Sequence, residues 1–188
     1  MFKEVFEKLI GYEGGYVFDE DDPGGETYKG ISRKHFPKWE GWVFVDGVKG
    51  KQDFPTVLKS NEFLQSAVKL FYKVEFWDKM NCGIMPPKLA EEMFESSVNC
   101  GKERATVFLQ TALNVLNNNE KHYKNIHSDG KFGNVTLSTL KVCLDKVEEK
   151  LLFNLLNFLQ ASFYLELMLN NEVKEKYIGW FNRIEIIK

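Results

Sequence analysis

A glutamate followed by two glycines and a tyrosine, Glu13 to Tyr16, gives the clearest indication of chemistry in this chain. Asp22 follows with eight residues between the two carboxyl groups, in a turn sequence Asp-Pro-Gly-Gly-Glu that leads directly into Thr27. Two carboxyl groups on either side of a sugar are the catalytic groups of most glycosidases. The pattern therefore indicates cleavage of a glycosidic bond.

Each of these residues has an expected role and a plain structural alternative. We expect Glu13 to end a helix, where the helix dipole disfavours a carboxylate by about 0.3–1 kcal/mol and so favours the protonated form that a general acid needs. Asp22 in a wet turn would stay ionised and could activate a water that the Thr27 hydroxyl holds. Taken alone, the three residues are also explained by a solvated helix end, a turn and the start of a strand.

Composition excludes several other classes of protein. The chain has 188 residues, 44% of them apolar and 14% aromatic, which suits one well-packed domain. A net charge of −2 provides neither a basic surface for nucleic acid nor a polybasic patch for membranes. Cys82, Cys100 and Cys143 lack metal-ligating spacing, so we expect free thiols in a protein made in a reducing compartment. No metal or organic cofactor is implied.

Two apolar stretches bear on where the protein is made and where it acts. The first residues lack the apolar core and the cleavage site of a signal peptide, which predicts synthesis in the cytoplasm without a leader. Residues 151–169 are the most apolar stretch, but Asn154, Asn157 and Gln160 interrupt them. This pattern predicts a central helix of a soluble bundle and no stable membrane insertion.

Hydrophobic spacing predicts a mainly α architecture with a small β-hairpin element near the N-terminus. We expect the hairpin at residues 16–31, with one β piece at 16–18 and another at 28–31. Residues 32–55 lack a clear pattern and are expected to form an exposed excursion. In the helix that follows we expect a face of Phe63, Ala67, Leu70, Phe71 and Val74. Helices are predicted over residues 2–13, 61–77, 86–100, 102–117, from 136, over 149–169, and around 179–183.

Several motifs, in one order along the chain, resemble glycoside hydrolase family 108, the bacterial and phage N-acetylmuramidases. The N-terminal motifs are the Glu-Gly-Gly-Tyr start, the Asp-Pro-Gly-Gly-Glu-Thr turn and the Gly-Ile at 30–31. Val98-Asn99-Cys100-Gly101 stands where the family has Asn-x-Gly, although a small residue is usual in place of Cys100. Residues 129–136 are similar to the Asp-Gly-x-x-Gly-x-x-Thr motif of the family's peptidoglycan-binding region, and 179–183 to its Gly-Trp-x-Asn-Arg ending.

The resemblance implies one lysozyme-like domain over residues 1–188, with a catalytic part at 1–100 and a helical peptidoglycan-binding part at 101–188. It implies an N-acetylmuramidase with Glu13 as the general acid, and with Asp22 and Thr27 managing the water. Asp19 and Asp21 compete with Asp22 as the second carboxylate. An Asp22 that acts as base predicts an inverting reaction, with the two carboxyl groups about 6.5–9.5 Å apart. The expected substrate-binding residues are Tyr16, Tyr28, Asn99 and Gln110.

The expected partner is the glycan strand of peptidoglycan, bound by a monomer. Delivery to the cell wall or periplasm without a signal peptide fits a phage or prophage endolysin released through a holin. Three other activities stay open: a lytic transglycosylase, a peptidoglycan-binding protein without catalysis, and a chitinase.

Overall fold

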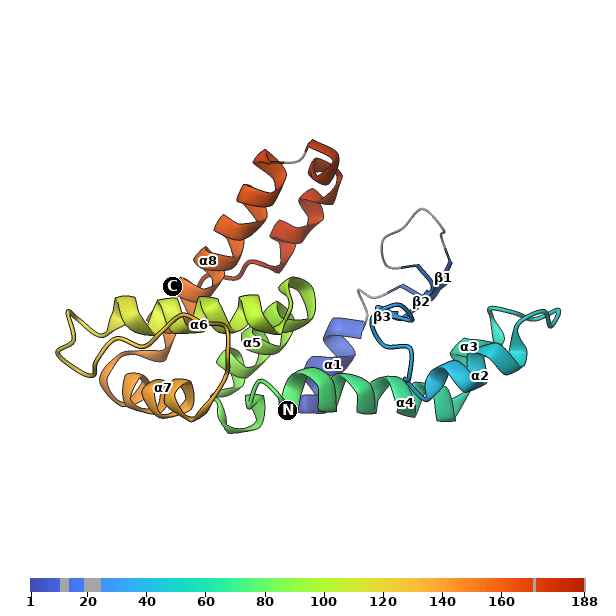
Figure 1. Cartoon of the computed structure of the whole chain (residues 1–188), viewed down its shortest axis with the longest axis horizontal. Coiled ribbons are helices and arrows are strands. Elements are labelled where there is room, and N and C mark those ends of the chain that lie inside the picture. The colour runs from blue at the N-terminus through green and yellow to red at the C-terminus, as the bar shows by residue number, and fades with distance from the viewer. Residues whose placement is uncertain (11–13, 19–24, 171, 188) are drawn as a thin grey trace. The chain divides into compact units, whose positions relative to one another are not determined.

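The computed structural model describes residues 1–10, 14–18, 25–170 and 172–187. The chain forms two compact units, Met1–Asp78 and Lys79–Lys188, which we describe one at a time. Helices dominate both units, and a small antiparallel sheet lies near the N-terminus (Figure 1). The predicted mainly α, lysozyme-like fold with one small β element is confirmed.

The N-terminal unit begins with α1 (Phe2–Ile10), which buries Phe6 and Leu9, and continues into the sheet. Strands β1 (Tyr16–Val17), β2 (Thr27–Tyr28) and β3 (Ile31–Ser32) pair in sequence order. The expected single β piece at 28–31 is wrong, because Lys29 and Gly30 have φ of 44° and 76° and make a turn between two strands.

Residues 32–55 are not the exposed excursion that we expected. They include α2 (Gly41–Val48), and the short α3 (Val57–Ser60) follows a few residues later. Trp42, Val45 and Val48 face the core at spacings of three, and Trp42 is 2% exposed. A Cβ at Gly41 would lie 2.3 Å from the Trp39 ring, so only glycine allows this close contact.

The next helix, α4 (Glu62–Tyr72), begins at an Asn61 cap and continues as a π-helix, η1 (Lys73–Asp78). Its buried residues are Leu64, Ala67, Val68 and Tyr72. Much of the expected face is therefore wrong, since Phe63 and Leu70 are 55% and 53% exposed. α4 carries apolar residues on most sides, so the sheet and α2 that pack on it decide which side is buried.

The C-terminal unit is a helical assembly centred on three long helices. After η2 (Cys82–Ile84) come α5 (Pro87–Cys100), α6 (Lys102–Leu116), α7 (Asn134–Lys146), α8 (Glu149–Leu169) and η3 (Glu172–Arg183). α8 packs on α5 and α6, and η3 returns along α8 (orange and red in Figure 1). The bounds expected for α5, α6 and α8 are confirmed to within about one residue, because Pro87 and Gly101 delimit α5.

Helix α8 is, among the described residues, the one helix long and apolar enough to cross a membrane. Of its most apolar 18-residue stretch, 39% is buried within the structure. The core helix of a globular protein has the same length and composition, and α8 contacts α5, α6 and η3. This packing suits a role in the core of the unit.

Candidate functional site

Two of the predicted catalytic residues, Glu13 and Asp22, lie outside the described residues, as do Asp19 and Asp21. The structure describes the segments that flank them. In the sheet, Tyr16 pairs with Tyr28 and Val17 pairs with Thr27. This register brings Thr27 next to the strand that begins at the tyrosine of the Glu-Gly-Gly-Tyr motif, so the two predicted catalytic motifs lead into neighbouring strands.

A cluster of ion pairs supports the sheet through Glu26, which is 9% exposed. Arg33 Nε lies 2.6 Å from one Glu26 carboxylate oxygen, and Lys49 Nζ lies 2.7 Å from the other. Arg33 also pairs with Asp46 at 2.6 Å and lies over the Trp42 ring, 4.3 Å from its centre. Glu26 therefore ties β2 to the segment around α2.

The electrostatics of this cluster keep Glu26 ionised and fix Tyr16. Burial raises the pKa of Glu26, but hydrogen bonds from Lys49 and Arg33 outweigh it and hold this pKa below its usual value. Burial and then the hydrogen bond with Glu26 raise the pKa of Tyr16. The Tyr16 ring also meets Phe54 edge to face, with centroids 4.7 Å apart.

Thr27 and Tyr28 differ in their access to solvent. Thr27 is half-buried, and its hydroxyl donates to the Gly25 carbonyl at 3.3 Å. Tyr28 is fully buried, and its hydroxyl donates to the Leu58 carbonyl at 3.1 Å. In this arrangement Tyr28 packs beneath the sheet, and its substrate contact stays a prediction.

The turn at Lys29 connects the sheet to α4 and to the Glu-Gly-Gly-Tyr motif. Lys29 N donates to the Gly15 carbonyl at 3.1 Å, and the Tyr72 hydroxyl donates to the Lys29 carbonyl at 2.8 Å. The Lys29 ammonium donates to Gln65 Oε1 at 2.6 Å. Lys29 is thus fixed at its side chain and at its backbone, which is bonded to Gly15 within the Glu-Gly-Gly-Tyr motif.

Gln110, a predicted substrate-binding residue, is 2% exposed in the C-terminal unit. Its Oε1 accepts from Gly130 N at 2.9 Å, and its Nε2 donates to Asp129 and to Thr136. Asp129 also accepts from Lys131 N at 2.9 Å. Gln110 therefore holds the loop of the Asp-Gly-x-x-Gly-x-x-Thr motif, and its contact with substrate stays a prediction.

Asn99, the other predicted substrate-binding residue of this unit, connects two motifs. Arg183 Nη1 donates to Asn99 Oδ1 at 2.9 Å and lies 3.4 Å from Glu95 Oε1. The Asn99 Nδ2 atom is buried with no hydrogen-bond partner in the part of the chain that the structure describes. The Asn-x-Gly motif and the Gly-Trp-x-Asn-Arg ending therefore meet, and a substrate contact by Asn99 stays a prediction.

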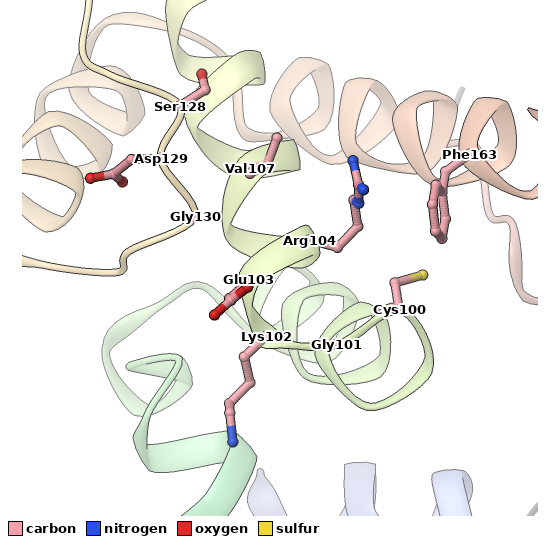
Figure 2. Close-up of a pocket in the computed structure, with 10 residues that line it drawn as sticks. All are labelled: Cys100, Gly101, Lys102, Glu103, Arg104, Val107, Ser128, Asp129, Gly130 and Phe163. Carbon is pink, nitrogen blue, oxygen red and sulfur yellow. The ribbon is translucent and has the colours of Figure 1, made fainter. Parts of the chain in front are cut away.

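A cavity of about 620 Å³ opens beside the start of α6 (Figure 2). The guanidinium of Arg104 lies over the Phe163 ring at 4.9 Å, so the two side chains extend toward each other from α6 and α8. Acidic side chains, Glu103 and Asp129, also line it. The remaining lining residues are Cys100, Gly101, Lys102, Val107, Ser128 and Gly130.

The described residues contain no group of three or more His, Cys, Asp or Glu side chains that could hold a metal ion. The three cysteines are free thiols, as predicted, with Cys82 and Cys143 buried.

Comparison with models of known protein families shows the family to which the chain belongs. The sequence model described as Glycosyl hydrolase 108 matches residues 6–101, which are 96 of the 188 residues. The chain belongs to the glycosyl hydrolase 108 family. A second model, described as Predicted Peptidoglycan domain, matches residues 104–185. For this family 108 protein the two matches confirm the predicted resemblance and support a lysozyme-like protein that acts on peptidoglycan.

The structure of Brucella abortus SagA is similar, with a TM-score of 0.61 at 21% sequence identity. The match covers 97% of this family 108 chain and 88% of that chain, and at this identity the likeness shows the fold. Among curated proteins nothing matches the chain significantly.

Proposed function

We propose that the protein is an N-acetylmuramidase that hydrolyses the β-1,4 bond between N-acetylmuramic acid and N-acetylglucosamine in peptidoglycan. The observation that carries the proposal is the family 108 match over residues 6–101, which includes both Glu13 and the Asp22 turn. The predicted peptidoglycan domain over 104–185 supplies the substrate class.

In the proposed reaction Glu13 gives its proton to the glycosidic oxygen as the bond to the muramic acid carbon breaks. Asp22 takes a proton from a water that attacks this carbon from the opposite face, and Thr27 positions the water. The products are one new reducing end and one new 4-hydroxyl group. The half-buried Thr27, on the strand beside the Glu13 motif, suits this role better than a core position would.

Substrate contacts are proposed for Tyr16, Tyr28, Asn99 and Gln110. Tyr16 is the best placed of the four, because it is partly exposed and the charged Glu26 holds its hydroxyl. Tyr28 and Gln110 are buried, so they would act by supporting the backbone that meets the glycan.

The test is digestion of purified peptidoglycan by the wild type and by Glu13→Gln, with the products reduced by borohydride and identified by mass spectrometry. Reduced muramic acid ends from the wild type alone would support the muramidase. Anhydromuramic ends would indicate a lytic transglycosylase. Equal activity on chitin would indicate a chitinase. A folded wild type that binds peptidoglycan but releases nothing would be a binding protein, and the catalytic assignment would fail.

A second contact with peptidoglycan is proposed at the Arg104 cavity, because Arg104 and five other lining residues belong to the predicted peptidoglycan domain. The cavity is lined by both basic and acidic side chains. The peptide stems of peptidoglycan carry carboxylates that a stacked guanidinium can pair with. The test uses the inactive Glu13→Gln variant, whose binding to peptidoglycan is measured by co-sedimentation. Adding Arg104→Ala to this variant is expected to weaken the binding about tenfold. Lys141→Ala, an exposed change on α7, is the control and should leave binding unchanged. Equal binding by both variants would contradict this role.

Action on the cell wall follows from the two family matches, and its finer setting is proposed. The protein would act as a bacteriolytic endolysin of phage or prophage origin, made in the cytoplasm and released through a holin. Expression in a bacterium with and without a holin, followed by turbidity, tests this, since lysis without a holin would contradict it.

A further inference from the structure

Two lysines, Lys29 and Lys59, lie beside Gly15 of the Glu-Gly-Gly-Tyr motif. Lys29 N is bonded to the Gly15 carbonyl, and a Cβ at Gly15 would lie 3.9 Å from Cε of Lys59. Both lysines therefore lie beside a glycine of the motif whose first residue is the proposed catalytic acid.

The Lys59 ammonium is close enough to Lys29 to affect it. Burial, and then repulsion from the Lys59 ammonium, lower the pKa of Lys29. Among the residues that the structure describes, no Asp or Glu pairs with either lysine. In the same unit Lys49 and Lys73 do pair, with Glu26 and Asp78. Lys29 and Lys59 are thus two neighbouring ammonium groups with no ion-pair partner among the described residues.

The Lys29 ammonium is also held in a fixed place. Gln65 Oε1 accepts from it at 2.6 Å, while Gln65 Nε2 donates to the Leu58 carbonyl at 2.8 Å and to the Tyr28 hydroxyl at 3.0 Å. Lys29 itself has a φ of 44°, a conformation that a non-glycine residue adopts only when its surroundings impose it. A rigid, half-buried cation next to a second cation is suited to binding an anion.

Resting on the proposed muramidase, we propose that Lys29 and Lys59 form an anion subsite for the acidic substituent at O3 of muramic acid. N-acetylglucosamine has a hydroxyl at this position, so the subsite would select peptidoglycan over chitin. The acidic group is either the lactyl carboxylate, free where the stem peptide has been removed, or a carboxylate of the stem peptide itself. Both place negative charge near O3 of the same sugar.

The test compares three soluble substrates of equal length. They are peptidoglycan strands with stem peptides, the same strands stripped by an amidase, and chitin oligosaccharides. Lys59→Gln is the main variant because this side chain is exposed, and Lys29→Gln is the second. Lys59→Arg keeps the charge, and Lys51→Gln changes an exposed lysine elsewhere in the unit.

We expect Lys59→Gln to raise KM on muramic-acid strands about tenfold, which corresponds to about 1.4 kcal/mol, with little change in kcat. Lys59→Arg and Lys51→Gln should stay near the wild type, and no variant should weaken the use of chitin. A higher KM on stripped strands alone assigns the lactyl carboxylate, and a higher KM on intact strands alone assigns a carboxylate of the stem peptide. A higher KM on both kinds of strand means that the subsite accepts either acidic group. Unchanged KM in both lysine variants of an active enzyme overturns the subsite and leaves the muramidase intact.

If the wild type cleaves nothing, a binding measurement still tests the subsite independently of the activity. Calorimetric titration of the folded wild type with stripped strands would then show binding that Lys59→Gln weakens about tenfold. That result keeps the subsite and rejects the muramidase. Equal affinity of the wild type for stripped strands and chitin, or no effect of Lys59→Gln, rejects the subsite.

Discussion

Replacing Glu26 by glutamine removes the charge that holds the N-terminal sheet to the segment around α2. The carboxylate is 9% exposed and lies 2.6 Å from Arg33 and 2.7 Å from Lys49. After the change the two cations face a neutral amide, although Arg33 keeps Asp46 as a partner. We expect the N-terminal unit to lose stability while it keeps its fold, because glutamine has nearly the same volume.

The size of the loss follows from the exposure of the partners. Buried hydrogen bonds between charged groups contribute about 1.5–3 kcal/mol, and exposed ion pairs about 0–1 kcal/mol. Arg33 and Lys49 are 28% and 39% exposed, between these limits. We therefore expect Glu26→Gln to lower the free energy of unfolding by about 2 kcal/mol. Asp46→Asn, at a carboxylate 52% exposed, is the matched control and should cost less than about 1 kcal/mol.

Tryptophan fluorescence in urea measures this loss, because three of the four tryptophans, Trp39, Trp42 and Trp77, belong to the N-terminal unit. The pH dependence supplies a second measurement. Since the pKa of Glu26 is lowered in the folded protein, its stabilisation is present above the unfolded pKa and is lost as the pH falls through the folded pKa. Wild type and Glu26→Gln should converge in acid. A variant as stable as the wild type at pH 7, or a difference that persists below pH ~3, would refute the reasoning.

Three further changes test the C-terminal unit by circular dichroism in urea. Burial raises the pKa of Glu92 to about 7, so the wild type should lose stability as the pH rises from about 5 to 8. Glu92→Gln should show no such loss, and equal losses in the two proteins would contradict this reasoning. Gln110→Ala removes buried hydrogen bonds, so it should lower the free energy of unfolding by about 2–3 kcal/mol and expose the 121–133 loop to protease. An unchanged rate of cleavage in this loop would contradict the prediction. Gly101→Ala should cost about 1–3 kcal/mol because φ is 87°, more than Gly133→Ala, where φ is −107°.

The helices of the C-terminal unit were predictable because residues typical of helix ends stand at their boundaries. Pro87 and Gly101 bound α5, and the Asn run after Leu116 ends α6. The buried face of α4 was less predictable. With apolar residues on most of its surface, the side that is buried depends on the sheet and α2, which periodicity within one helix does not specify.

The family was predictable from motifs whose residues are adjacent in sequence, those around Glu13 and Asp22, while the roles of these two residues stay predictions. The cluster around Glu26 was missed, although Glu26 stands within the quoted turn. Its partners Arg33 and Lys49 are seven and 23 residues away, and only folding brings them to one carboxylate. Likewise Gln110 was expected to bind substrate, and its burial depends on a loop that lies twenty residues further along the chain.

The segment after η3 completes the C-terminal unit from a great distance along the chain. Glu185 N donates to Asn157 Oδ1 at 2.7 Å, and the Glu185 carboxylate pairs with Lys88 at 3.0 Å, 97 residues earlier. At about 5–20 residues per second, a ribosome needs roughly 5–20 s to make those 97 residues. Asn157 is made 28 residues before Glu185, so for roughly 1–6 s it lacks the peptide group that it binds in the native state. The N-terminal unit, whose 78 residues contain its own contacts, does not wait for a distant partner and can fold first during synthesis.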